Sequence, residues 1–406
     1  MRLTTVLRRL IAVTSIFVRG FEFTISGLIL DVRPTWRRPR CSQCQRRGAI
    51  YDTQASRRWR HLNLGSLRIW LRCAPRRVHC RHCGTVRVEH LPWAVSGSGF
   101  TLAFEELCAY LAQITDRTSV TKLLGIDWRT VGVIVGRVVD RKIDPSRLKG
   151  LRRIGIDEFS YRKRHRYLTI VVDHDRRRVV WVGEGKSAAA LSRFFAEIGL
   201  EVCRQLESVT MDMSGGYQRA VRDHAPQAII VFDRFHVQKL AGDALDQVRR
   251  EVVREMDDGD LRRALKRSRW PLLKNADEAT ERDTRKLSDI ERSYKPLYRA
   301  YLLKEGLRLA LSRKQPWRAR QDLQEWIGWA VRSRLEPFKR VGRTVRKHFE
   351  GIVAYSKLRL TNGLVEGINA KSRMIARRAY GFHSAHALGA MIMLCSGGIE
   401  LEPALP

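Results

Sequence analysis

The pattern of hydrophobic and polar positions divides the chain into four stretches. Alternating runs such as His61–Gly65 and Leu67–Leu71 are typical of β-hairpins. Apolar positions three or four residues apart predict helices over residues 99–142. Strand-like and helix-like patterns alternate over residues 152–240, and a charged helical pattern covers residues 240–350. The chain therefore combines a β-rich N-terminal part, a helical part, an α/β part and a second helical part.

Residues 119–138 have the pattern of a helix-turn-helix. A first helix ends at a turn around Gly125, and a second helix begins at Ile126 or Asp127. The buried face of the second helix is expected to carry Trp128, Val131, Ile134 and Val138. In this motif the second helix enters the major groove of DNA, which makes Arg129 a candidate DNA contact. A plain helical hairpin is the alternative interpretation.

The α/β stretch predicts five strands and two helices in the order βββαβαβ. The strands are Arg153–Phe159, Tyr167–Asp173, Arg178–Gly183, a strand ending at Ser208–Asp212, and Ala228–Asp233, and the helices are Ser187–Ile198 and Gly216–His224. A meander followed by right-handed crossovers places the fourth strand beside the first and parallel to it. This arrangement brings Asp157 close to Asp212, at the strand ends where open α/β sheets bind ligands.

The second helical stretch is predicted to be an all-α insertion between the last strand and a later helix that carries Glu366. It contains four tryptophans, Trp270, Trp317, Trp326 and Trp329. We expect these side chains to pack in the core, because tryptophan is seldom left exposed. Stacking on an unpaired base is the alternative.

The net charge of the chain indicates what kind of partner it binds. The 406 residues include 77 Lys and Arg against 42 Asp and Glu, a net charge of +35. Neutralising phosphates releases counterions, so nucleic acid is the expected partner. A membrane surface is disfavoured because the basic residues are spread over the whole length. The N-terminal apolar run Leu10–Val18 is too short to span a bilayer, and Arg8, Arg9 and Arg19 suit a basic helix. We expect a soluble, cytoplasmic protein without a membrane partner.

Four of the eight cysteines form two Cys-x-x-Cys pairs. They are Cys41, Cys44, Cys80 and Cys83. Four thiolates in two such pairs are typical of a structural Zn²⁺ site, which leaves no open coordination position. Cys73, His79 and His82 are spare ligand candidates, and four reduced surface cysteines are the alternative.

A lone carboxylate stands in a basic C-terminal segment. Glu366 is the only acidic residue between Glu350 and Glu400. Together with Asp157 and Asp212 it suggests a magnesium site, because hard divalent cations take oxygen ligands. Two such ions clamp the attacking and leaving oxygens of a phosphodiester displacement. Asp157 and Glu158 point to opposite faces of their strand, and alternation does not decide which one faces the site.

Five motifs resemble those of ISL-three-type insertion-sequence transposases, in the same order along essentially the whole chain. They are Ile154–Ser160, Val209–Ser214, Phe232–Val237, Thr361–Asn369 and Arg378–His383. The resemblance implies a ribonuclease-H-like core of the DDE type. It also implies that Asp157, Asp212 and Glu366 are the metal-binding triad and that Glu158 is not.

The resemblance also marks Asp233 and His236. His236 could hydrogen-bond the scissile phosphate or orient a carboxylate; a helix-capping Asp with a packed His is the alternative. Asn369 lies one helical turn after Glu366 and could orient it, whereas Asn362 is expected to cap the helix. The basic side chains that follow are candidate DNA backbone contacts, with a solvated basic face as the alternative. They are Lys371, Arg373, Arg377 and Arg378.

The expected protein is thus multidomain. A zinc-binding module (1–95) and a helix-turn-helix domain (96–150) precede a ribonuclease-H-like α/β core (151–240 and 351–406), which an all-α insertion (241–350) interrupts. The expected function is a bacterial, nucleoid-associated transposase that cuts and joins DNA at terminal inverted repeats and target sites. It would use two Mg²⁺ ions, with Mn²⁺ as a substitute, and work as a homodimer or larger assembly. A zinc and helix-turn-helix regulator and a ribonuclease-H-like nuclease are the alternatives.

Overall fold

The computed structural model describes residues 3–162, 166–257, 259–360, 362–379, 382 and 384–403. Thr361, Tyr380, Gly381 and His383 of the motifs named above lie outside the described residues. The chain forms two compact units, residues 1–144 with 377–406, and residues 145–376. Within the described parts, no helix combines the length and the apolar character needed to cross a membrane.

Two small sheets build the N-terminal part of the first unit. Helix α1 (Leu3–Leu10) precedes a four-stranded sheet of order β1-β2-β5-β4 and a three-stranded sheet of order β3-β6-β7. The strands are β1 (Ile16–Thr24), β2 (Gly27–Pro34), β3 (Ala49–Thr53), β4 (Arg57–Arg60), β5 (Ile69–Cys73), β6 (Arg76–Cys80) and β7 (Thr85–Val88). The strand predicted at Leu67–Leu71 is partly confirmed by β5, which pairs with β4 in an antiparallel arrangement, whereas the predicted run His61–Gly65 forms no strand and has only an isolated bridge between Leu64 and Leu67.

The expected N-terminal basic helix is only partly right. Helix α1 carries Arg8 and Arg9, but Arg19 lies on β1, which pairs with β2 in an antiparallel hairpin. Ile16 and Val18 are buried while Phe17 and Arg19 are exposed, so the two-residue period of a half-buried strand decides this segment.

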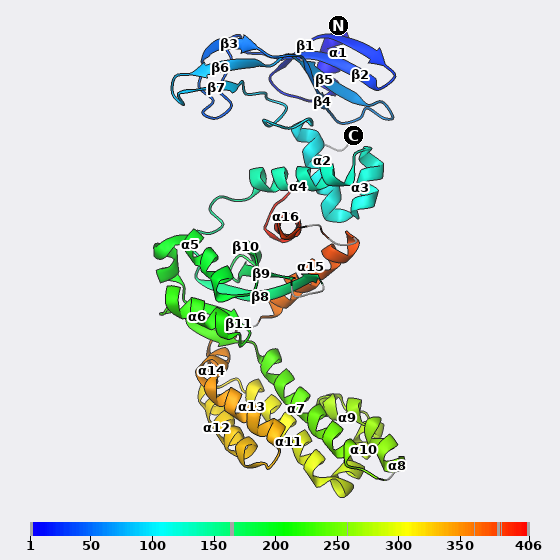
Figure 1. Cartoon of the computed structure of the whole chain (residues 1–406), viewed down its shortest axis with the longest axis vertical. Coiled ribbons are helices and arrows are strands. Elements are labelled where there is room, and N and C mark those ends of the chain that lie inside the picture. The colour runs from blue at the N-terminus through cyan, green and yellow to red at the C-terminus, as the bar shows by residue number, and fades with distance from the viewer. Residues whose placement is uncertain are drawn as a thin grey trace. The chain divides into compact units, whose positions relative to one another are not determined.

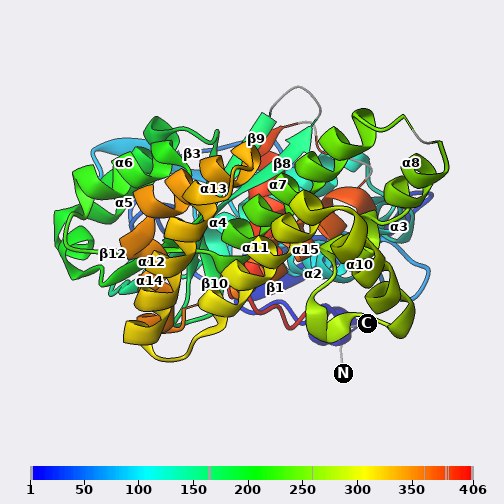
Figure 2. The ribbon, with the colours of Figure 1, turned by 90° about the horizontal axis from the view of Figure 1, so that it is seen from below.

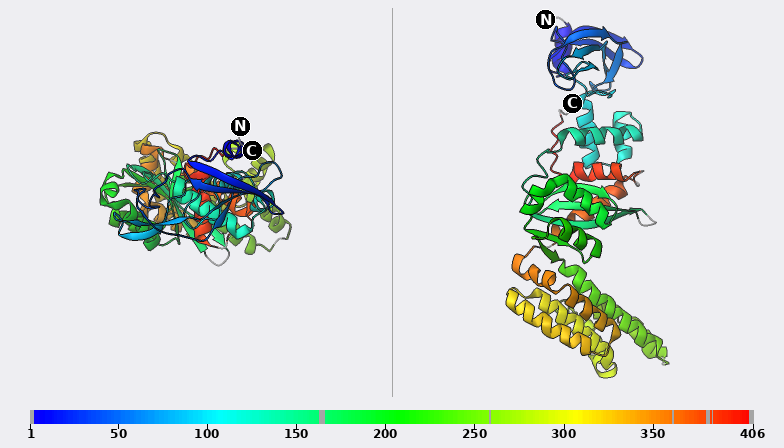
Figure 3. Two further views of the ribbon diagram at one scale, coloured as in Figure 1. Left: turned by 90° about the horizontal axis from the view of Figure 1, so that it is seen from above. Right: turned by 60° about the vertical axis from the view of Figure 1, so that its left-hand side comes forward.

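Three helices and the C-terminal helix complete the first unit. They are α2 (Leu102–Ile114), α3 (Arg117–Leu124), α4 (Trp128–Lys142) and α16 (Ala385–Ser396). Gly125 ends α3 with a φ of 62°, and the side chain of Asp127 caps α4 by accepting a hydrogen bond from the Thr130 N–H, so the predicted turn and helix start are confirmed. Gln113 of α2 donates to the Leu394 carbonyl of α16, which lies beside these helices (Figure 3).

A five-stranded sheet forms the α/β part of the second unit, beside α5, α6 and α15 (Gly363–Arg378) (Figure 1). Its order is β10-β9-β8-β11-β12; β8, β9 and β10 are antiparallel neighbours, and β11 runs parallel to both β8 and β12. The elements are β8 (Arg153–Arg162), β9 (Arg166–Asp173), β10 (Arg178–Glu184), α5 (Ala188–Gln205), β11 (Ser208–Met211), α6 (Gly215–His224) and β12 (Ile229–Phe232). The predicted order and the pairing of the fourth strand with the first are confirmed.

Helices make up the described remainder of the second unit, as predicted. They are α7 (Arg234–Arg254), α8 (Gly259–Lys266), α9 (Arg269–Leu273), the 3₁₀ helix η1 (Ala276–Glu278), α10 (Glu281–Ser293), α11 (Lys295–Ser312), α12 (Pro316–Arg332), α13 (Glu336–Lys347), α14 (Phe349–Leu358) and α15 (Gly363–Arg378). Figure 2 shows α11, α12 and α13 side by side. The last two residues of α15 belong to the first unit.

Core packing is confirmed for one of the four tryptophans and wrong for the other three. Trp326 is 3% exposed and donates its indole N–H to the Leu303 carbonyl, whereas Trp270 is 66% and Trp317 64% exposed. Trp329 is partly exposed. Helical periodicity gives the buried face of α12, but Trp317 lies in its first turn, away from that face. The five predicted domain segments stay a prediction, although the structure groups residues 377–406 with the N-terminal unit.

Candidate active site and zinc site

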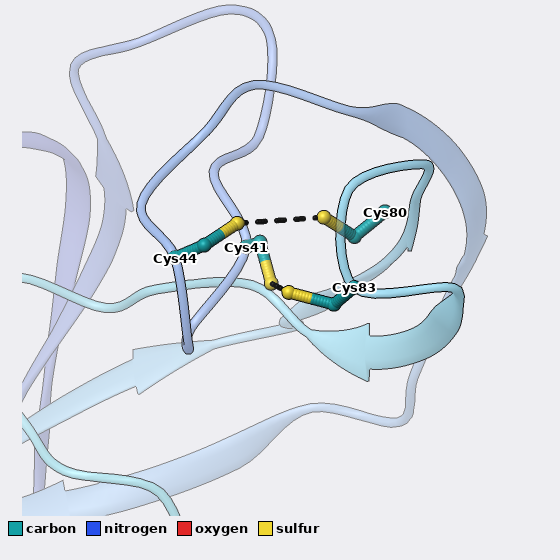
Figure 4. A group of neighbouring side chains, drawn as sticks. All are labelled: Cys41, Cys44, Cys80 and Cys83. Carbon is teal, nitrogen blue, oxygen red and sulfur yellow. Dashed lines mark hydrogen bonds between the residues drawn. The ribbon is translucent and has the colours of Figure 1, made fainter.

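The four cysteines predicted to bind zinc lie together (Figure 4). Among the described residues they are the only group of three or more Cys, His, Asp or Glu side chains whose ligand atoms all lie within 4.8 Å of one another. The sulfur of Cys41 is 4.0 Å from that of Cys83, and the sulfur of Cys44 is 3.5 Å from that of Cys80. Sulfurs around a tetrahedral zinc at ~2.3 Å stand about 3.8 Å apart, so the spacing fits the ion.

Short chain segments make this cluster. Each pair sits in a tight turn, with the Cys41 carbonyl accepting from the Gln45 N–H and the Cys80 carbonyl accepting from the Gly84 N–H. The backbone N–H of Cys83 lowers the pKa of Cys80 to about 7, while the Cys44 sulfur and burial raise the pKa of Cys83 to about 12. Four thiols this close cannot all ionise without a cation, which zinc would supply.

The candidate carboxylate site is built at the carboxyl end of the parallel strands. Asp157 lies on β8, and Asp212 directly follows β11, whose Thr210 is in register with Gly155 of β8. Because β8 and β11 are adjacent and parallel, the two carboxylates reach the same end of the sheet. The Asp212 side chain accepts a hydrogen bond from the Ser214 N–H at 3.0 Å, which fixes it at the start of α6.

Helix α15 brings Glu366 to the sheet. Asn369, buried in α15, donates its Nδ2–H to Oδ2 of Asp157 at 2.7 Å. Glu158 points the other way and lies 3.8 Å from Lys186. The structure thus resolves the alternative that alternation left open, since Asp157 and not Glu158 faces the helix that carries Glu366.

A second connection fixes the start of α15, through residues that sequence reasoning did not identify. Thr210 of β11 donates its hydroxyl hydrogen to Oδ1 of Asn362 at 2.8 Å, and the Nε2 of His174 lies 2.8 Å from the same hydroxyl. Asn362 stands at the helix start as predicted, and its carbonyl accepts from the Glu366 N–H. The motif that contains Asp212 also contains Thr210, so the signal was present in the sequence.

Close approach of the helix explains the glycine in the first motif. A Cβ on Gly155 would stand 2.5 Å from a methyl carbon of Val365 and 2.9 Å from the His174 ring. Atoms do not approach so closely, so any larger residue here would push α15 away from β8. The spacing between Glu366 and the sheet therefore depends on this glycine.

The carboxylates of the site affect one another's ionisation. Burial, together with the charges of Asp212 and Glu158, raises the pKa of Asp157 to about 6, although the Glu158 N–H and His236 oppose this shift. Burial and the neighbouring charge of Asp233 raise the pKa of Glu366. Several acidic groups thus converge here at a cost that a bound cation would offset.

Asp233 and His236 lie beside these carboxylates. The buried Asp233 caps α7 by accepting from the Phe235 N–H, and its other oxygen lies 3.1 Å from Nδ1 of His236. This hydrogen bond raises the pKa of His236, and the charges of Asp157 and Asp212 raise it further. Asp233 is therefore a helix cap, as one interpretation of the sequence expected. His236 also faces the acidic cluster, as the other interpretation requires.

The predicted DNA contacts fall into two groups. Arg129, Lys371, Arg373 and Arg377 are exposed. Arg378 is engaged inside the first unit, where its Nη2 donates to the Gln113 and Thr115 carbonyls at 3.1 and 2.9 Å. It stabilises the C-terminal end of α2, so its role as a DNA contact stays a prediction with fewer free donors than the sequence suggested.

Three family models match the chain in sequence order. Residues 37–83 match a zinc finger of the transposases of IS204, IS1001, IS1096 and IS1165, residues 89–139 match the helix-turn-helix domain of transposase family ISL3, and residues 154–392 match a DDE transposase model of ISL3 type. The first match includes all four clustered cysteines. The predicted structural zinc site and DNA-binding helix-turn-helix are thereby supported.

Two kinds of relatives match nearly the full length. The transposase for insertion sequence element IS1557 of Mycobacterium tuberculosis is 38% identical over 393 residues, covering 90% of this chain and 87% of the relative. The transposase for insertion sequence element IS1001 of Bordetella parapertussis is 30% identical over 357 residues, covering 87% and 88%.

Proposed function

This chain belongs to the ISL3 family of insertion-sequence transposases, and from that premise we propose which residues carry its DDE-type chemistry. Asp157, Asp212 and Glu366 are the catalytic carboxylates, and together they hold Mg²⁺, with Mn²⁺ as a substitute. The observation that carries the proposal is the hydrogen bond from Asn369 to Asp157, which ties the helix of Glu366 to the strand of Asp157.

The donor set fits magnesium. It offers carboxylate oxygens, the hard ligands that Mg²⁺ prefers. The side-chain oxygen Oδ1 of Asn369 is buried without a hydrogen-bond partner among the described residues, which leaves a further acceptor beside the cluster. When bound, two such ions would activate the nucleophile and neutralise charge on the leaving oxygen.

The topology supports a ribonuclease-H-like core. Three antiparallel strands followed by two parallel ones give the order 3-2-1-4-5, with the acidic residues on the central strand and at the end of its parallel neighbour. Helix α15 then adds the third carboxylate after an all-α insertion.

Hydrolysis of a phosphodiester at the element's end consumes one water and yields a 3′-hydroxyl and a 5′-phosphate. The freed 3′-hydroxyl then attacks a phosphodiester of the target, so one P–O bond forms as another breaks and no covalent protein intermediate is needed. Asp233 holds His236 beside the carboxylates. The raised pKa of His236 favours the protonated ring, which can donate to a phosphate oxygen.

DNA would be held by basic side chains on both units. Arg129, at the exposed start of α4, is placed as helix-turn-helix proteins place their base-contacting residues, and the expected sites are terminal inverted repeats. Lys371, Arg373 and Arg377 would contact phosphates beside Glu366. Each protomer has one set of the three carboxylates and each event joins two DNA ends, which supports a dimer or larger assembly.

The test is cleavage of a duplex that carries the element's terminal repeat, in Mg²⁺, by wild type, Glu366→Gln and Glu158→Gln. Nicking at the repeat boundary should vanish in Glu366→Gln and persist in Glu158→Gln, whose side chain points away from the site. Equal nicking by wild type and Glu366→Gln would remove Glu366 from the site. Repeat-specific binding without nicking by any of the three would favour the regulator.

A further inference from the structure

A groove lies within the second unit, along the edge strand β12 of the five-stranded sheet. It has a volume of about 1220 Å³ and lies between β12 with α6 on one side and α12 to α14 on the other. Phe232, the last residue of β12, lines it, and the next residue is Asp233 of the carboxylate site. The groove therefore begins one residue away from the candidate catalytic cluster.

The groove carries a strong excess of positive charge. Arg222, Arg346, Lys347 and Lys357 line it, are exposed, and form no ion pair with any described part of the chain. Glu350 is the only acidic lining residue, and both of its oxygens accept from Arg320, at 3.0 and 2.6 Å. The surface is therefore complementary to a polyanion.

The charge also acts on a histidine in the groove. Burial lowers the pKa of His348, and the positive charges of Lys347 and Arg222 lower it further. Its ring packs edge-on against Phe232 with 5.0 Å between the ring centres. The direction of this shift is consistent with an excess of positive charge around His348.

Aromatic rings stand among these cations. Trp317, in the first turn of α12, is exposed at the groove, and Phe349 carries the guanidinium of Arg320 at 5.1 Å from its ring centre. Cationic grooves with exposed aromatic rings are the means by which proteins bind single strands, because every unpaired base offers a π-face for stacking. A paired, stacked duplex hides those faces, so it gains little from an exposed indole.

We propose that this groove binds an unpaired DNA strand, with Trp317 stacking on a base and Arg346 and Lys347 contacting its phosphates. The inference rests on the proposed function, since it extends the path of the strand whose phosphodiester the carboxylates cut. The groove would hold the strand that leaves the catalytic cluster along β12.

The experiment measures binding of the full, zinc-loaded chain to a labelled oligothymidylate and to a mixed-sequence duplex, in buffer without Mg²⁺ or Mn²⁺, across a salt series. Arg346→Ala/Lys347→Ala should reduce the salt slope for the single strand by about 1.4, the loss of two phosphate contacts. Trp317→Ala should weaken single-strand binding about fivefold or more, and Trp317→Phe should keep most of the affinity.

Matched controls separate the groove from bulk charge and bulk surface. Arg282→Ala/Arg292→Ala removes two exposed arginines of α10, and Trp270→Ala removes the other strongly exposed insertion tryptophan, which lies outside the groove lining. Both controls should bind the single strand nearly as wild type does. Thermal melting of each variant confirms that folding is retained.

Three outcomes would overturn the proposal. They are unchanged single-strand binding by the groove variants, equal losses in groove variants and controls, and a loss confined to the duplex. Because Mg²⁺ and Mn²⁺ are left out while the structural zinc stays bound, this result is independent of catalysis. If Glu366→Gln abolishes nicking while the groove variants bind normally, the carboxylate assignment stands and the groove fails; the reverse pattern would keep the groove and remove the assignment.

Discussion

The zinc site and the carboxylate site differ in how their ligand residues are arranged. The four cysteine sulfurs stand at tetrahedral spacing, and all come from two tight turns of one small module. The carboxylates come from β8, the end of β11 and α15, and they do not form one equally tight group among the described residues. One site is closed and local, and the other is spread over distant parts of the sequence.

The difference has a physical reason. A structural ion needs a filled shell, and burying it stabilises the module directly. A catalytic ion must leave room for substrate oxygens, so its ligands remain apart and are held by other groups. Asn369 and the pair Thr210–Asn362 serve that purpose here, since they fix α15 against the sheet.

The largest expected effect is on the closed site. Cys44→Ser should abolish zinc binding and unfold the N-terminal module, because the binding energy of a structural zinc is about 10–16 kcal/mol. Zinc content per chain and limited proteolysis of residues 1–95 would measure both. Cys73→Ser is the control, since Cys73 lies outside the cluster, and loss of zinc there would break the assignment of the four ligands.

The second effect sharpens the contrast, because activity and stability should move in opposite directions. Asp157→Asn should lower nicking about 10³-fold through loss of a metal ligand. The metal-free variant should melt higher at neutral pH, by an energy of roughly 1 kcal/mol, because a carboxylate whose folded pKa is raised destabilises the fold once it ionises. A lower melting temperature than wild type in buffer without Mg²⁺ would contradict this explanation.

The third effect concerns the groups that hold the open site. Asn369→Ala should weaken Mg²⁺ binding about 10- to 100-fold, and the maximal nicking rate should fall less. The carboxylate ligands remain, but Asp157 loses its orienting hydrogen bond. A titration of nicking against Mg²⁺ separates the two parameters. A fall in the maximal rate alone, with unchanged metal dependence, would indicate that Asn369 acts on the DNA instead.

Much of this architecture followed from the sequence. Alternation and helical period gave the order of the five strands, and glycine and aspartate gave the turn and cap of the helix-turn-helix. The strand pattern did not show which of the neighbours Asp157 and Glu158 faces the site. Packing against α15 distinguishes them in the structure. Nor did the engagement of Arg378 with α2, which depends on contacts more than 260 residues apart.

The smallest effect is a pH dependence confined to the open site. Without Mg²⁺, Asp157 is protonated in both states only well below its unfolded value of 3.8, and the fold loses stability as the pH rises from there to about 6, because the unfolded state ionises first. The difference in stability between Asp157→Asn and wild type should therefore grow over this window. Urea unfolding in buffer without Mg²⁺ or Mn²⁺ at several pH values measures it, and a flat difference would mean that the carboxylate is well solvated.

The hydrogen bond between Asn369 and Asp157 joins residues 212 positions apart, which has a consequence during translation. A ribosome that adds ~5–20 residues per second needs about 10–40 seconds to pass from one residue to the other. For nearly all of that interval the growing polypeptide lacks Glu366, and it also lacks α16, which packs against α2 in the first unit. Prematurely terminated products therefore lack the complete acidic set, and DNA cleavage requires a chain that has been translated through α15.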